Sequence, residues 1–289
     1  MQRAGGTPSG DPFLGRVAVV TGGAAGLGLA MAPAFAARGA SLVLADIDAA
    51  ALAQAERELA AAGAEVLGVP ADVTRRESVV ALADAAFARF GAVHLLCNNA
   101  GIALLGPLVG ADTGDWRKAM DVNFWGVVHG IDAFLPRMIE QRQGGHVVNT
   151  ASIGGLQMRP GWNTGAYSMT KYAVVALSEA LEQELAGSGI GVSVLCPASV
   201  RTAIYDSAKN RPARLGGPFR REQQHFLKDT IADGLTPLQV GERVLRAIRD
   251  DEFFVFTHSE PRQLIEARHR RIMEAFDRIA EIEHEERTC

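Results

Sequence analysis

Val17-Ala-Val-Val-Thr21-Gly-Gly-Ala-Ala-Gly-Leu-Gly28 joins a short apolar run to a glycine-rich turn, and an alanine-rich segment follows it. Glycines in such a turn let the backbone bend sharply and let a phosphate approach without meeting a Cβ atom. The N-terminus of the following helix offers unpaired N–H groups to a pyrophosphate. A glycine-rich turn is by itself a weak signal, because a purely structural tight turn has the same composition. Its place directly after the first apolar run favours the opening strand, turn and helix of a dinucleotide-binding fold.

Seven short apolar runs alternate with longer segments of helical periodicity. The runs are Val17 to Thr21, Ser41 to Ala45, Glu65 to Val69, Val93 to Cys97, His146 to Thr150, Gly191 to Leu195 and Phe253 to Thr257. The helical segments are Leu27 to Arg38, Ala49 to Ala62, Arg75 to Phe90, Asp115 to Gln141, Ala166 to Ala186 and Pro237 to Asp250. Such continuously apolar runs are typical of parallel strands buried on both faces. The alternation predicts a Rossmann-like, doubly wound α/β fold, with a seven-stranded, mainly parallel sheet and helices on both faces in a single domain.

Three segments fall outside this alternation. We interpret residues 1–14 as a loose polar arm ahead of the single domain at 15–289. The segment at about 198–234, which holds Pro212, Gly216, Gly217 and Pro218, lacks a clear element, and loops of that length are commonly functional lids or disordered. Residues 261–286 predict an amphipathic helix that docks on its own core or on a neighbouring subunit. Acids and bases are mixed on that helix, which disfavours membrane attachment.

The composition argues against several classes of partner. A formal net charge of −4 leaves no basic footprint for nucleic acid. The three cysteines lack metal-ligand spacing and their odd number argues against a disulfide framework, so a reducing cytoplasm fits best. No apolar run approaches the ~18 residues of a membrane span, and the first residues lack the apolar core of a signal peptide. His94, His129 and His146 are isolated in the sequence, so we expect no metal site.

An acid stands at the end of the second apolar run. Asp46, in Leu42-Val-Leu-Ala-Asp46-Ile-Asp48, can accept hydrogen bonds from both ribose hydroxyls of an adenine dinucleotide, whereas it would repel a 2′-phosphate. The alternative is that one of the two aspartates only caps the helix beginning at Ala49. Asp48 suits the cap better, which leaves Asp46 free. No basic residue stands in the glycine-rich turn or directly after Asp46, so the charge pattern favours NAD over NADP.

Several motifs occur in the order in which the short-chain dehydrogenase/reductase family has them. The chain therefore resembles that family from about Gly15 to Phe256. These motifs are the TGxxxGxG turn at Thr21 to Gly28, the pair Asp72-Val73 beside the adenine, the NNAG segment Asn98 to Gly101, and the catalytic tetrad Asn123, Ser152, Tyr167 and Lys171. The resemblance implies that the cofactor is contacted by Gly22, Gly26, Leu27, Gly28, Asp46, Ile47, Asp72, Val73, Asn99, Tyr167, Lys171, Pro197, Val200 and Thr202.

Tyr167 and Lys171 are four residues apart in Tyr167-Ser-Met-Thr-Lys171 and so share one helix face. A tyrosine with a pKa of about 10 is a poor base near neutrality, but an adjacent ammonium and an oxidised nicotinamide both favour the phenolate. Tyr167 would take the proton of an alcohol in oxidation and return it to a carbonyl oxygen in reduction. The resemblance implies that Lys171 also holds the nicotinamide ribose.

The other two tetrad positions have ordinary structural alternatives. The resemblance implies that Ser152 hydrogen-bonds the substrate oxygen and that Asn123 holds a water which passes the proton onward beyond Lys171. Standing alone, Ser152 would be interpreted as a strand-end cap and Asn123 as a residue bonded to backbone inside a helix. The joint pattern favours the catalytic interpretation.

The substrate is less defined than the reaction. Ala198 stands where the family usually has glycine, and its Cβ could narrow the nicotinamide side of the cleft. We expect Ile153 to Ala166 and Ala203 to Gly234 to form the pocket walls. Pro197 to Gly216 and Phe253 to Arg268 resemble a bacterial subgroup that includes the Cα-dehydrogenases of lignin-derived β-aryl ethers. That resemblance implies a bulky, largely apolar or aryl secondary alcohol or ketone.

Other functions and assemblies stay open at this point. A steroid dehydrogenase or a 3-oxoacyl-type reductase could use the same scaffold, although no basic cluster suits a phosphopantetheine arm. A non-catalytic dinucleotide-binding sensor could retain the fold, but a degraded tetrad would be expected there. By resemblance, Asp115 to Gln141 and Ala166 to Ala186 pair across a two-fold axis, which implies a homodimer or, as the favoured case, a homotetramer.

Overall fold

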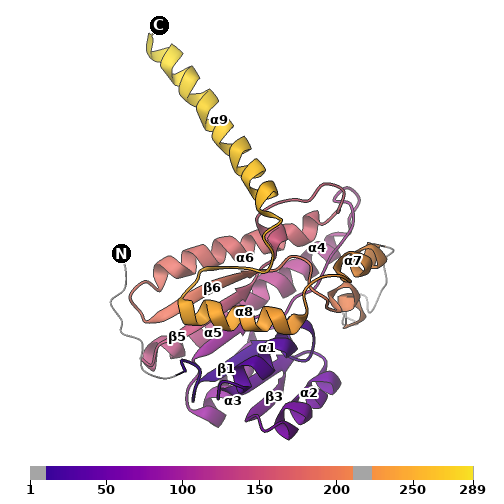
Figure 1. Ribbon diagram of the computed structural model, residues 1–289, viewed down its shortest axis with the longest axis vertical. Coiled ribbons are helices and arrows are strands. Elements are labelled where there is room, and N and C mark those ends of the chain that lie inside the picture. Colours follow the sequence, from indigo (N-terminus) through magenta and orange to yellow (C-terminus); the bar gives the residue numbers. More distant parts are fainter. Residues whose placement is uncertain (1–10, 211–222, 289) are drawn as a thin grey trace.

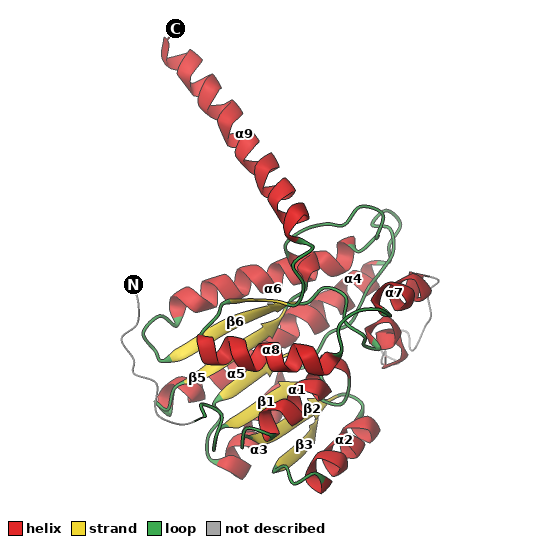
Figure 2. Ribbon diagram, in the orientation of Figure 1, coloured by secondary structure: helices red, strands yellow, loops and turns green. Residues whose placement is uncertain are grey.

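Seven short strands rich in valine and leucine form one twisted sheet at the centre of the molecule (Figures 1 and 2). The computed structural model describes residues 11–210 and 223–288. The strands are β1 Val17–Thr21, β2 Ser41–Asp46, β3 Val66–Pro70, β4 Leu95–Asn98, β5 Gly145–Thr150, β6 Ile190–Cys196 and β7 Phe254–Phe256. Their order is β3-β2-β1-β4-β5-β6-β7, and every neighbouring pair is parallel. The prediction of a seven-stranded, doubly wound α/β fold in a single domain is confirmed.

Helices cover both faces of the sheet (Figure 2). They are α1 Gly26–Ala36, α2 Ala49–Ala61, α3 Arg76–Phe90, α4 Thr113–Met120, α5 Gly126–Glu140, α6 Gly165–Glu184, α7 Gln223–Ile231, α8 Pro237–Asp250 and α9 Arg262–Thr288. Buried residues of α1, α2 and α8 form one core layer, and those of α3, α5 and α6 form the other. Phe35 and Phe134 are fully buried in these two layers, and each stabilises the fold by about 1.5–3 kcal/mol. Two cores on opposite faces explain why the strands carry no polar face.

The helix expected from Asp115 to Gln141 is present, but it contains a π-helical turn. It begins at Thr113, because Asp112 caps it by accepting a 2.7 Å hydrogen bond from the Gly114 N–H. A π-helical turn at Asp121–Trp125 then separates α4 from α5. Such a turn inserts one extra residue into the helical repeat, and it commonly marks a functional site. The predicted helix therefore continues through this turn with a local change in its hydrogen-bond pattern.

Two segments differ from expectation: the N-terminal arm and the segment at 198–234. Phe13, assigned to the loose arm, is buried and its ring centroid lies 5.8 Å from that of Phe35, because an aromatic side chain beside the core gains from burial. Residues 1–10 lie outside the described residues. The expected loop at 198–234 contains a 3₁₀ helix, Ile204–Asn210, and α7. Pro212, Gly216, Gly217 and Pro218 lie outside the described residues, as does Cys289.

The C-terminal helix α9 extends away from the body of the molecule (Figure 1). None of its residues, Arg262–Thr288, is buried. The prediction that it docks on the core of its own chain is wrong, whereas the neighbouring-subunit alternative stays a prediction. Within residues 11–210 and 223–288, no helix combines the length and the apolar character that a membrane span requires.

Candidate active site

The glycine-rich turn lies where the strand order reverses. β1 has β2 on one side and β4 on the other, and ligands of doubly wound sheets bind in the crevice at this point. Gly22 and Gly26 have φ of +65° and +55°, a left-handed conformation that side chains rarely adopt. A Cβ atom on Gly28 would collide with the carbonyl oxygen of Gly22 and approach the Asn99 side chain within 2.7 Å. The turn therefore requires glycine for its conformation and for its close packing.

A cavity of about 300 Å³ opens over the carboxyl ends of these strands. It is lined by most of the residues predicted to hold a cofactor, namely Gly22, Gly26, Leu27, Asp46, Ile47, Asp72, Val73, Asn99, Tyr167, Lys171, Pro197 and Thr202. Gly28 packs against the Gly22 carbonyl and is not among the residues lining this cavity, and Val200 lines a different cavity. Thr150, at the end of β5, and Ile102, in the segment after β4, also line the cavity. Neither was identified from the sequence, because both contribute through their position rather than through a motif.

Asp46 and Asp48, at the end of β2, have different roles. Asp48 caps α2, as predicted, and accepts a 3.0 Å hydrogen bond from the Ala51 N–H. Asp46 is not free, because its two carboxylate oxygens accept hydrogen bonds from the N–H groups of Ala24, at 3.1 Å, and Asp48, at 3.0 Å. These bonds orient the carboxylate at the cavity wall. Each oxygen retains a lone pair that can accept a hydrogen bond from a hydroxyl.

Thr21 joins the ends of β1 and β4. Its hydroxyl oxygen accepts hydrogen bonds from the backbone N–H groups of Asn99, at 2.9 Å, and Ala100, at 3.1 Å. In return, the Asn99 side-chain amide donates to the Thr21 carbonyl at 3.0 Å. The NNAG segment is thus held against the glycine-rich turn, so the two motifs form one continuous rim.

Tyr167 and Lys171 lie on α6 and both face the cavity. The Lys171 ammonium donates a 2.7 Å hydrogen bond to the Thr150 carbonyl and lies 5.8 Å from the centroid of the Tyr167 ring. Burial lowers the pKa of Lys171 to about 8. Burial also raises the pKa of Tyr167, against the opposing effect of a hydrogen bond with Ser152. Within the protein alone, burial therefore shifts the pKa of Tyr167 away from the phenolate expected near neutrality.

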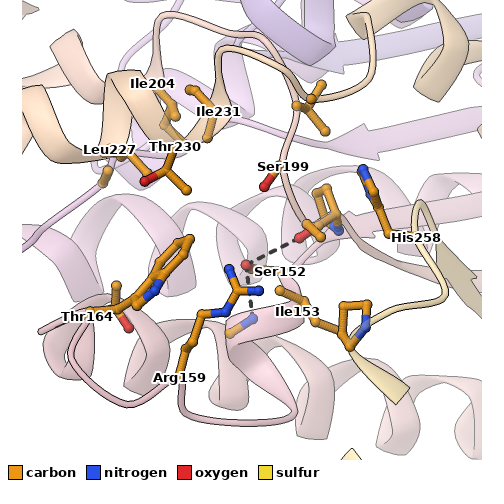
Figure 3. Close-up of a pocket in the computed structure, with 18 of the residues that line it drawn as sticks. Ser152, Ile153, Arg159, Thr164, Ser199, Ile204, Leu227, Thr230, Ile231 and His258 are labelled. Carbon is orange, nitrogen blue, oxygen red and sulfur yellow. Dashed lines mark hydrogen bonds between the residues drawn. The ribbon is translucent and has the colours of Figure 1, made fainter. Parts of the chain in front are cut away.

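Ser152 follows β5 and begins a 3₁₀ turn, Ile153–Gly155. Its hydroxyl oxygen accepts a 3.1 Å hydrogen bond from the Gly154 N–H, and the hydroxyl makes a long 3.5 Å contact to the Pro197 carbonyl (Figure 3). The strand-end cap considered for this serine is therefore present. The cap also directs the hydroxyl toward the cavity on the side of Tyr167, so the structural and the catalytic interpretations are compatible.

Asn123 lies in the π-helical turn and is fully buried. Its carbonyl oxygen accepts from the Ile102 N–H at 2.8 Å, and its amide donates to the Ile102 carbonyl and to the Thr170 hydroxyl, both at 3.0 Å. The backbone-bonded alternative therefore describes this side chain. The relay water predicted for Asn123 stays a prediction, while the observed contacts connect the segment after β4 to α6.

Figure 3 shows a second cavity, of about 430 Å³. It adjoins the first, because Tyr167 lines both. One wall is the loop with Gln157, Arg159, Trp162 and Thr164, and another is formed by Ile204 with Leu227, Thr230 and Ile231 of α7. Both walls match the predicted loops. A third wall was missed: it consists of His258, Glu260, Pro261 and Leu264, which follow β7. They lie within Phe253 to Arg268, which a resemblance connects with a substrate class, but the return of the chain past β7 is what places them on this wall.

Ala198, the departure from the family pattern, lines this second cavity. Its backbone N–H donates a 2.9 Å hydrogen bond to the Thr257 hydroxyl, which holds the segment after β6 against the end of β7. Gln157 has a buried side-chain oxygen with no hydrogen-bond partner among the described residues. The cavity therefore combines apolar walls with a few polar groups, as small-molecule sites do.

Residues 16–213 match the sequence model of a known family, described as short chain dehydrogenase. The chain belongs to the short-chain dehydrogenase family. Short-chain dehydrogenases are oxidoreductases, and dependence on NAD or NADP is general among them. The glycine-rich turn and the Asp46 carboxylate fit such a cofactor.

Solved and curated short-chain dehydrogenases are similar over most of the chain. A Burkholderia phymatum family member solved in complex with NAD is 41% identical, with a TM-score of 0.87 over 91% of this chain and 96% of that one. A 1-deoxy-11-beta-hydroxypentalenate dehydrogenase of Streptomyces exfoliatus is 37% identical, covering 86% of this chain and 84% of that relative. A C alpha-dehydrogenase of Sphingobium sp. strain SYK-6 is 34% identical, covering 91% and 87%.

Proposed function

We propose that this protein is an NAD(H)-dependent oxidoreductase that interconverts a secondary alcohol and a ketone, with Tyr167 as the acid and base. The observation that carries the proposal is the position of Tyr167 between two adjoining cavities. One cavity is lined by the glycine-rich turn, which suits a dinucleotide, and the other has room for an organic substrate. A group that lines both cavities can exchange a proton with the substrate oxygen while the attached carbon exchanges hydride.

The residues around the first cavity suit a dinucleotide. The glycine-rich turn and the N-terminus of α1 would bind the pyrophosphate, and Asp46 would bind the adenine ribose. Lys171 would contact the ribose at the nicotinamide end. When bound, NAD supplies the acceptor for the hydride that leaves the substrate carbon. The carboxylate of Asp46 supports NAD over NADP, because it would repel a 2′-phosphate.

The proton moves through Tyr167. In ketone reduction the phenol donates its proton to the carbonyl oxygen while the carbon gains hydride. A raised pKa suits this direction, because the phenol is protonated at neutral pH. In oxidation the phenolate takes the hydroxyl proton, and the positive charge of oxidised nicotinamide would lower the pKa of the phenol for this step. Ser152 would donate a hydrogen bond to the substrate oxygen in both directions.

The second cavity supports a bulky, largely apolar or aryl substrate. Trp162, Ile204 and Leu227 line it, and its volume of about 430 Å³ lies within the range typical of small-molecule sites. Two relatives have names that specify a C alpha-dehydrogenase and a hydroxypentalenate dehydrogenase, and these names accord with alcohols larger than simple aliphatic ones. We also propose, from the family resemblance, that the protein assembles as a homotetramer or homodimer.

The experiment is to follow nicotinamide absorbance with NAD and NADP in parallel, across aryl, steroid, 3-oxoacyl and aliphatic secondary alcohols and ketones, with Tyr167→Phe as the control. Turnover of bulky aryl members with NAD, lost in the variant, supports the proposal. Turnover confined to steroids or 3-oxoacyl thioesters supports the other enzymatic functions. Tight NAD binding without turnover of any member favours a dinucleotide-binding sensor.

A further inference from the structure

Helix α9 carries an exposed apolar stripe along one face. Ile265, Ile272, Phe276 and Ile279 follow one another at intervals of seven, four and three residues, which places them on the same side of a helix. Ile272, Phe276 and Ile279 expose 38%, 66% and 52% of their surface. With 27 residues the helix is about 40 Å long. A stripe of this length on a projecting helix is typical of a helix that packs against a partner.

The charges of α9 are divided between its two halves. The basic half, residues 262–273, carries Arg262, Arg268, Arg270 and Arg271 against one acid, Glu266. The acidic half, residues 274–288, carries Glu274, Asp277, Glu281, Glu283, Glu285 and Glu286 against Arg278 and Arg287. An isolated helix prefers acids near its N-terminus and bases near its C-terminus. The charges here have the opposite arrangement, so α9 alone is electrostatically disfavoured.

A second copy of the same helix can cover the apolar stripe and balance the charges of both halves when it runs antiparallel. The basic half of each helix then lies beside the acidic half of the other, and the two macrodipoles oppose each other. A parallel copy would align like charges along the whole length. An anionic membrane surface would attract the basic half but repel the acidic half, which carries Ile279. Charge complementarity therefore selects an antiparallel copy of the chain.

The apolar stripe specifies a register for this pair. When Ile272 faces the partner's Ile279, Phe276 lies at the centre of the stripe beside the partner's Ala275 and Phe276. In the same register Arg268 faces the partner's Glu283 at each end of the apolar region. Apolar residues thus meet in the middle and opposite charges meet at both ends, as in antiparallel coiled coils.

We propose that α9 is an association surface through which two copies of this protein pair as antiparallel helices, centred on Ile272, Phe276 and Ile279. The pairing reaches the substrate cavity, because Leu264, in the first turn of α9, lines that cavity. In the register above, Leu264 lies opposite the partner's Arg287. The second copy therefore places the partner's Arg287 beside the cavity wall that carries Leu264.

The direct test is disulfide cross-linking of the full-length protein in a Cys289→Ser background. Ile272→Cys and Ile279→Cys are made separately and then mixed. Antiparallel pairing predicts a cross-link in the mixture but not in either variant alone, since identical positions are then seven residues, about 10 Å, apart along the axis. Cross-linking within each single variant would indicate a parallel pair and overturn the proposal. A mixture that stays uncross-linked, or α9 bound to vesicles of anionic lipid instead, would also overturn it.

A charge exchange tests the register independently of the cysteines. Arg268→Glu or Glu283→Arg alone should weaken association about threefold to tenfold in sedimentation, and the two together should restore it, because each ion pair occurs twice in the dimer. Phe276→Glu should weaken association at least about tenfold through loss of apolar burial. Glu274→Gln, on the opposite face, is the matched control and should have no effect. If the double variant is as weak as the single ones, the proposed register is wrong.

Discussion

The Lys171 ammonium donates a 2.7 Å hydrogen bond to the carbonyl of Thr150, the last residue of β5. Lys171 is 3% exposed, so this bond replaces part of its lost hydration. The contact joins α6 to the carboxyl end of a central strand, which holds the ammonium beside the Tyr167 ring. The same burial that positions the lysine lowers its pKa to about 8.

Stability should depend on pH through Lys171. An unfolded lysine titrates near 10.5 and the folded one at about 8, so between these values the unfolded state binds more protons and rising pH favours the folded state. From pH about 7.5 to pH about 9.5, the unfolding free energy of the wild type should rise by about 2 kcal/mol relative to Lys171→Met. Urea denaturation of both proteins at the two pH values measures this. An unchanged difference would show that Lys171 keeps an ordinary pKa.

Tyr167→Phe should reduce kcat by at least about 100-fold in both directions, because it removes only the hydroxyl that exchanges the proton. Binding of NADH, followed by fluorescence titration, should stay within a few fold of the wild type. The ring remains in place, so the fold should be unaffected. If the variant keeps near-normal turnover, another group must move the proton.

The two directions of the reaction should respond to pH in opposite ways. Burial raises the pKa of Tyr167, so the protonated phenol needed for ketone reduction persists through neutral pH. Reduction should stay constant there and decline only in strongly alkaline solution, whereas oxidation should increase as pH rises. Steady-state rates with NADH and NAD across this range test the assignment. A reduction rate that falls between pH about 6 and 8 would point to a different acid, such as a histidine.

Asp46→Asn should raise the ratio of kcat/KM with NADP to that with NAD at least about tenfold, since two charges ~5 Å apart in a half-buried site repel by a few kcal/mol. The asparagine retains an oxygen for the N–H of Ala24 or Asp48. Asp48→Asn is the matched control: it alters the cap of α2 but should leave the cofactor preference unchanged. Equal ratios in the wild type and Asp46→Asn would remove Asp46 from cofactor selection.

Gly28→Ala should destabilise the fold and weaken NADH binding together. The added Cβ would meet the Gly22 carbonyl, which is backbone and cannot rotate away, so the turn itself must shift. Overpacking of this kind costs about 1–3 kcal/mol. Thermal unfolding and NADH titration of the same preparation measure both effects. Normal NADH affinity in this variant would mean that the turn does not hold the cofactor.

The sequence predicted every strand to within two residues at each end, because parallel strands buried on both faces are continuously apolar. The positions of the helices were predicted from their apolar periodicity. The π-helical turn at Asp121–Trp125 was not predicted, because it does not change that periodicity. Most residues predicted for the cofactor side lie together around one cavity, since they follow strand ends in recognisable motifs. The third wall of the second cavity was not predicted from the residues, because His258 and Leu264 reach it only through the path of the chain after β7.

Local patterns in the sequence determined the order of strands and helices, the glycine turn, and the placement of Tyr167 and Lys171 on one helix face, because each depends on residues close together in the chain. Tertiary structure decided what depends on burial and on contacts between distant segments. It raised the pKa of Tyr167 and lowered that of Lys171, because desolvation depends on the whole enclosing fold. It also directed Asn123 to the Ile102 backbone and left α9 outside the core, with none of Arg262–Thr288 buried.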